Sequence, residues 1–141
     1  MDTTDRRMYQ RYPIYCPIEY RCEDPAFAET SVTLNLGEGG ALISTNRFHK
    51  TEAHLMVKIS LKGEVFFIRS KVVHAHPEKH DALYSVGVEF LQSPPGFIRS
   101  LYEELETIML YQSQAGAEAG NPLTLSEASI KWFGGSRFRA A

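Results

Sequence analysis

Apolar and polar positions alternate along the first half of the chain. From Ile14 to Cys22 every second residue is apolar, which is the period of a β-strand that buries one face in a core. Stretches of β-type composition predict further strands near residues 31–35, 41–44, 54–61, 64–74 and 84–91. Lys62-Gly63 is a tight hairpin signal between two of them. About six closely spaced strands without a helical pattern between them predict an antiparallel barrel.

The hydrophobic period changes after Ser93-Pro94-Pro95-Gly96. Apolar residues then recur at spacings of three and four, which predicts an amphipathic helix from about Phe97 to Gln112 that closes one end of the barrel. Residues 115–121 are small and polar and are expected to form a flexible connector. The chain therefore has the pattern of an all-β core with a C-terminal helix. We divide it into a flexible arginine arm (1–12), a barrel with its closing helix (13–114), and a linker with a C-terminal tail (115–141).

Composition narrows the classes of function. A chain of 141 residues suits one domain. Its formal net charge of -2 argues against a binder of nucleic-acid polymers or of anionic membranes, because both need a large positive field. No apolar run approaches the roughly 20 residues that cross a bilayer, and residues 1–7 lack the apolar segment of a secretory signal. We expect a cytoplasmic protein without membrane insertion that binds any anionic ligand locally.

Few residues have the spacing of a catalytic or metal site. On an extended strand Cys16 and Cys22 lie about 20 Å apart, too far for a disulfide, and are interpreted as core thiols. His74, His76 and His80 are the best metal candidates, but no cysteine or acidic residue is spaced to join them. No nucleophile motif, Walker loop or Rossmann fingerprint occurs. We predict no catalytic residue, no metal and no cofactor; a small hydrolase or metalloprotein is an alternative that rests on the histidines alone.

Two segments have chemistry suited to an anionic ligand. Arg6, Arg7 and Arg11 precede the first predicted strand, and a planar guanidinium suits a phosphodiester, although terminal arginines are often simply solvated. The segment Asn35-Leu36-Gly37-Glu38-Gly39-Gly40 lies between two strands. Its glycines permit unusual backbone dihedrals and let a ligand approach the main chain, and Asn35 both donates and accepts hydrogen bonds. The ordinary alternative is a tight connection between strands.

In this order and spacing the two segments resemble the PilZ family, whose signature is R-x-x-x-R followed by [D/N]-x-S-x-x-G between two barrel strands. Arg7-Met8-Tyr9-Gln10-Arg11 matches the first part. The second part is matched from Asn35 to Gly40 except at Gly37, which stands where the family has serine. Gly39-Gly40-Ala41-Leu42-Ile43 and Val86-Gly87-Val88-Glu89-Phe90 are similar to family strands, so the resemblance covers about residues 5–112.

The resemblance implies a six-stranded antiparallel PilZ-type β-barrel that binds the bacterial second messenger cyclic di-GMP on its surface. The implied roles are a clamp on phosphates and guanine edges by Arg7 and Arg11, a guanine contact by Asn35, and turn geometry set by Gly40. An arginine at Arg6 implies two stacked ligand molecules in place of one. The predicted ligand-binding residues are Arg6, Arg7, Arg11, Asn35, Gly37, Gly39 and Gly40.

Two functions remain open within this family. The first is a cyclic di-GMP receptor whose arm, mobile without ligand, becomes ordered on binding and signals to a downstream protein partner. The alternative is a degenerate PilZ protein that serves as a protein–protein adaptor and does not bind nucleotide. Gly37 favours the alternative, and the Arg7/Arg11 pair argues against it. Provided that Gly37 has a negative φ, Gly37→Ser is expected to restore a hydroxyl and tighten ligand binding.

Overall fold

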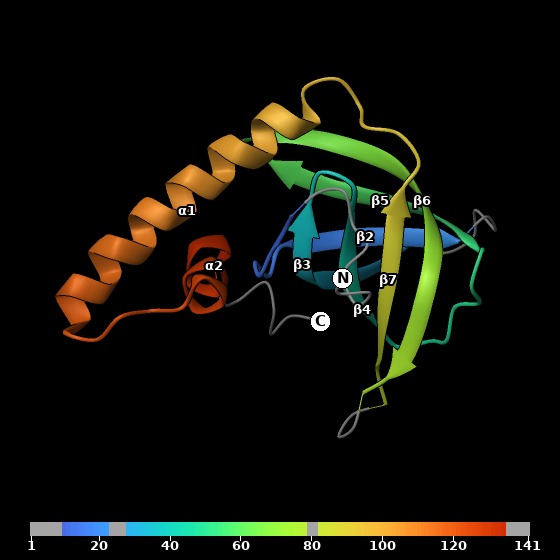
Figure 1. Ribbon diagram of the computed structural model, residues 1–141, viewed down its shortest axis with the longest axis horizontal. Coiled ribbons are helices and arrows are strands. Elements are labelled where there is room, and N and C mark those ends of the chain that lie inside the picture. The colour runs from blue at the N-terminus through green and yellow to red at the C-terminus, as the bar shows by residue number, and fades with distance from the viewer. Residues whose placement is uncertain (1–9, 23–27, 79–81, 135–141) are drawn as a thin grey trace, which may run out of the picture.

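A computed structural model describes residues 10–22, 28–78 and 82–134 (Figure 1). Within these ranges the chain forms seven strands followed by two helices. The elements are β1 (Arg11–Tyr12), β2 (Pro17–Cys22), β3 (Glu29–Gly37), β4 (Gly40–Thr45), β5 (His54–Leu61), β6 (Glu64–Pro77), β7 (Tyr84–Phe90), α1 (Phe97–Ala119) and α2 (Leu125–Phe133).

The strands close into a barrel because β3 has partners on both edges. Its first half pairs antiparallel with β2, and its second half pairs antiparallel with β4. The ring continues from β2 through β5, β6 and β7 back to β4, which makes six antiparallel strands in the described part of the chain. The short strand β1 adds to the end of β3, where Arg11 is opposite Gly37. The predicted six-stranded antiparallel barrel is confirmed, with one extra strand.

The barrel core is formed by the alternating apolar positions. Ile14, Cys16, Ile18 and Tyr20 are all buried, whereas Cys22 at the end of β2 is only partly buried. Both cysteines are free thiols. One mouth of the barrel is closed by α1, whose first residue, Phe97, is fully buried.

Helix α1 begins where the sequence predicted it but continues to Ala119 instead of ending near Gln112. The small residues that suggested a connector let two segments pack closely: Gly116 is buried, and a Cβ there would lie 3.2 Å from the carbonyl oxygen of Asn121. After Gly120, whose φ of 74° ends the helix, the chain turns back and Thr124 caps α2. Neither described helix is long and apolar enough to span a membrane.

A polar cluster lies where the end of β2 pairs with the start of β3. The hydroxyl of Tyr20 donates to Glu29 at 2.9 Å, and Arg47 forms an ion pair with the same carboxylate. His49 packs edge-on against Tyr20, with ring centroids 5.6 Å apart, and its Nδ1 lies 3.8 Å from the Cys22 sulfur. Its other nitrogen, Nε2, is buried without a hydrogen-bond partner within the described residues. Burial, and after it the positive charge of Arg47, lower the pKa of His49, so this imidazole is neutral in the folded protein at pH 7.

The lowered pKa predicts a loss of stability in mild acid. A group whose pKa is lower in the folded state stabilises the fold above its ordinary value, here 6.5, and this contribution is lost as the pH falls toward the folded pKa. We expect urea unfolding to show a smaller difference in stability between pH 7.5 and pH 5.5 in His49→Phe than in the parent. Equal differences in the two proteins would contradict the assignment. Glu29 does not interfere, because its pKa lies below its ordinary value of 4.5.

Candidate functional site

The β3–β4 turn contains two buried glycines, Gly37 and Gly40. Gly37 ends β3 and Gly40 begins β4, and neither has a positive φ. The carbonyl oxygen of Gly39 accepts a hydrogen bond from the Phe90 amide at 2.8 Å, which fixes the turn to the end of β7. Unusual dihedrals are therefore not the reason for glycine at Gly37 and Gly40. The reason is space.

Arg11 occupies that space. A Cβ on Gly37 would lie 2.3 Å from the backbone oxygen of Gln10 and 3.2 Å from Cγ of Arg11. A Cβ on Gly40 would lie 2.3 Å from the backbone oxygen of Val88 and 2.6 Å from Nη2 of Arg11. The same Nη2 donates to the Val88 oxygen at 3.4 Å. The structure thus brings one arginine of the first signature segment over two glycines of the second.

Asn35 has one end of its side chain engaged. Its Oδ1 accepts a hydrogen bond from the Leu42 amide at 3.0 Å, at the place where the β3–β4 register shifts between Thr33 and Asn35. Its amide nitrogen has no hydrogen-bond partner in the described part of the chain, so this donor remains available for a ligand. Arg6 and Arg7 lie outside the described residues, and their roles remain predictions.

Helix α1 reaches the same site through Tyr102. Its hydroxyl donates to the carboxylate of Glu38 in the turn, and its ring packs edge-on against Tyr12, with centroids 6.2 Å apart. The hydrogen bond to Glu38 raises the pKa of Tyr102, so the hydroxyl keeps its proton and remains a donor. Sequence reasoning missed both residues. Glu38 occupies a variable motif position, and Tyr102 had only the signal of an aromatic residue beside a helical stripe.

The histidines follow a different arrangement. The ring of His74 lies against Gly87, where a Cβ would be 2.3 Å from Nε2, and the rings of His74 and His76 are 5.2 Å apart. Among the described residues no three histidine, cysteine, aspartate or glutamate side chains gather as metal ligands. His80 lies outside those residues. Gly87 therefore acts as a packing position for His74.

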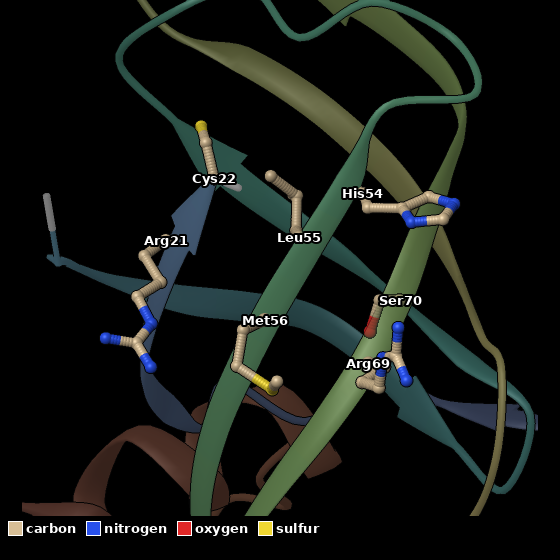
Figure 2. A pocket seen from close by; sticks show the side chains of 7 residues that line it. All are labelled: Arg21, Cys22, His54, Leu55, Met56, Arg69 and Ser70. Atoms are coloured by element: carbon tan, nitrogen blue, oxygen red, sulfur yellow. The ribbon is translucent and has the colours of Figure 1, made fainter. Parts of the chain in front are cut away.

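A hollow of about 250 Å³ lies on another part of the barrel (Figure 2). Arg21, Met56 and Arg69 line it from neighbouring positions on β2, β5 and β6. Strand β7 separates Arg69 from the turn: the Arg69 carbonyl oxygen accepts from the Leu91 amide, and the neighbouring Phe90 amide donates to Gly39. No residue of β1 or the β3–β4 turn lines this hollow, so it is separate from the place where Arg11 meets the glycines.

Several solved structures share this fold. They include the inhibitor of motility MotI of Bacillus subtilis (TM-score 0.61, 14% identity), the MrkH–c-di-GMP complex of K. pneumonia (0.60, 12%) and the PilZ domain of YcgR from Escherichia coli with c-di-GMP (0.56, 16%). The alignments cover 75%, 79% and 82% of this chain, respectively. They cover 53%, 55% and 98% of the other chains, so this chain spans about half the length of MotI and MrkH. At these identities the likeness establishes the fold.

Sequence comparison gives the family. No curated protein matches the chain. The family model for the PilZ domain matches residues 5–106, a span that holds both signature segments, the described strands and the first part of α1. It leaves the rest of α1 and all of α2 outside the match. With the matched span and the barrel in agreement, this chain belongs to the PilZ domain family.

Proposed function

We propose that this protein is a cyclic di-GMP receptor that binds its ligand between the arm and the β3–β4 turn. The observation that carries the proposal is the position of Arg11, whose Nη2 lies at Gly40 and 3.4 Å from the Val88 oxygen. Membership of the PilZ family supports it, as do two structures of the same fold, MrkH and the YcgR domain, which hold c-di-GMP. The protein would act as a signalling adaptor without catalytic chemistry, and through its arm it would regulate a protein partner.

The chemistry of the site suits a cyclic dinucleotide. At 3.4 Å the bond from Arg11 to a neutral carbonyl is long, whereas a phosphate would offer it a shorter, charge-assisted, bidentate partner. The amide nitrogen of Asn35 is a donor for a guanine edge, and the missing side chains at Gly37 and Gly40 let Arg11 lie close to the turn. We expect Arg7 to supply a second clamp and Arg6 to favour two stacked ligand molecules.

One observation favours the alternative of an adaptor that binds no nucleotide. The backbone oxygen of Gln10 lies 2.3 Å from the place where the Cβ of the serine in the family signature would be, which is too close for a side chain. Strand β1 therefore covers the turn more closely than a serine at Gly37 would allow. If this cover is permanent, the turn serves to fix the arm and binds no ligand.

Our first test removes the guanidinium. Arg11→Ala deletes charge-assisted hydrogen bonds that contribute about 1.5–3 kcal/mol each, so the affinity for cyclic di-GMP should fall at least tenfold in calorimetric titration. Arg7→Ala should have an effect of similar size. Arg21→Ala is the matched control and should bind like the parent, because Arg21 is an exposed arginine beside the start of β3, whereas Gly37 ends that strand. If Arg11→Ala and Arg7→Ala bind as tightly as the parent, the proposed site is wrong.

The second test concerns the departure from the family motif. The φ of Gly37 is not positive, yet a side chain there would meet the backbone of Gln10 at 2.3 Å. Gly37→Ser must therefore displace β1, which reverses the tightening expected from the sequence. Overpacking costs about 1–3 kcal/mol, so we expect binding to weaken on the order of tenfold.

Gly37→Ala is the control for this test, because it introduces the same Cβ without the hydroxyl. Equal weakening in the two variants assigns the effect to sterics. Tighter binding by Gly37→Ser than by the parent would show that β1 yields to the side chain and that the hydroxyl contacts the ligand.

A further inference from the structure

Helix α2 lies outside the span matched by the family model and contacts the root of the arm, which we define as residues 13–16. The Ser126 hydroxyl donates to the carbonyl oxygen of Pro13 at 2.8 Å. The Tyr15 amide donates to the Ser129 hydroxyl, also at 2.8 Å. Pro13 directly follows β1, so α2 holds the chain next to Arg11 and Tyr12.

The arm root connects β1 to β2 and has polar backbone groups on two sides. Thr33 of β3 serves one side, since its hydroxyl donates to the Ile14 oxygen at 2.8 Å and accepts from the Cys16 amide at 2.9 Å. On the other side, Ser126 of α2 bonds to Pro13, and Ser129 of α2 bonds to Tyr15. The arm root is therefore held between β3 and α2, and loss of α2 would leave it with hydrogen-bond partners on one side.

Helix α2 is itself fixed to the rest of the protein. The indole Nε1 of Trp132 donates to the buried carboxylate of Glu104 at 2.9 Å, and the other oxygen of this carboxylate accepts from the Lys62 amide at 2.7 Å. A capping box between Thr124 and Glu127 closes the first turn of α2. A helix with its own cap and a buried anchor can hold the arm root in one place.

Helix α1 makes a second connection to the same site. Tyr102 contacts Tyr12 of β1 and donates to Glu38 in the turn. Thus α1 contacts β1 and the turn, and α2 contacts the arm root. This arrangement links the C-terminal helices to both parts of the proposed ligand site.

We propose that α2 positions the arm and is thermodynamically coupled to nucleotide occupancy. Docked α2 fixes the arm root and so preorganises Arg11 over Gly37 and Gly40; bound ligand in turn stabilises docked α2. Because a coupling free energy is reciprocal, the factor by which α2 docking raises ligand affinity equals the factor by which ligand favours docking. The inference rests on the proposed function and adds the element that regulates the site and reports its state.

A purely architectural role for α2 makes a different prediction. Ser129 is fully buried, and its hydroxyl also donates to the Ser126 oxygen at 2.7 Å, so packing alone gives a reason for its presence. In that case removal of the serine contacts would lower global stability and leave the ligand affinity of the folded protein unchanged. Affinity and local amide exchange therefore separate the two roles.

The experiment uses the variant Ser126→Ala/Ser129→Ala in the full chain. We expect amide exchange of Arg11 and Tyr12 in the ligand-free protein to accelerate severalfold, and the dissociation constant for cyclic di-GMP to rise about three- to tenfold. Ser113→Ala, an exposed serine of α1, is the matched control and should change neither quantity. Thr124→Ala, which weakens the α2 cap without removing an arm contact, should shift both quantities in the same direction.

The reciprocal measurement is amide exchange of α2 in the parent, which should slow by a similar factor when cyclic di-GMP is added. Unchanged exchange at Arg11 and Tyr12 together with an unchanged dissociation constant in the folded serine variant would overturn the coupling. If the parent binds no cyclic di-GMP, the proposed function is wrong, and the exchange of β1 alone then decides whether α2 positions the arm. If the double variant does not fold, Thr124→Ala and the single Ser126→Ala decide the same question.

Discussion

Strand β3 is the element on which the rest of the structure depends, because three other strands pair with it. Its first half binds β2, its second half binds β4 on the other edge, and its last two residues bind β1. Backbone pairing on both edges of β3 closes the barrel. The same pairing puts Arg11 opposite Gly37. The pairing of β3 therefore both closes the barrel and positions the arm.

The absence of side chains at Gly37 and Gly40 decides how closely the arm approaches the barrel. At each position the backbone of another segment lies 2.3 Å from where a Cβ would be, a distance that no side chain tolerates without movement. Glycine at Gly37 thus lets the backbone of Gln10 and the side chain of Arg11 lie close to the turn.

Both C-terminal helices add contacts to this site, and those of α2 come from outside the matched PilZ span. Tyr102 of α1 holds Glu38, and the serines of α2 hold the arm root. In Figure 1, α1 runs away from the mouth of the barrel and α2 lies between it and the strands. Helix α2 contacts the arm root through its serines and leaves Lys131 and Trp132 exposed. An adaptor requires both a contact with its ligand site and a surface that another molecule can reach.

The sequence alone determined the features that depend on local pattern. Alternation from Ile14 to Cys22 predicted a strand with one buried face, the spacing after Gly96 predicted the start of α1, and the two motif segments predicted the family. Each of these signals lies within a short window, where side-chain period and turn chemistry directly reflect backbone geometry. The number and spacing of the predicted strands in turn predicted the barrel.

Only the tertiary structure decided what the small residues do. In the sequence Gly116 resembles part of a connector, but the chain returns and packs on it; Gly37 resembles a residue needed for unusual backbone dihedrals, but its role is to leave room for Gln10. The contacts of Tyr102 with Glu38 and of α2 with the arm root join residues 64, 113 and 114 positions apart. No local period encodes such pairs, because they exist only after the strands have closed and brought the two ends of the chain together.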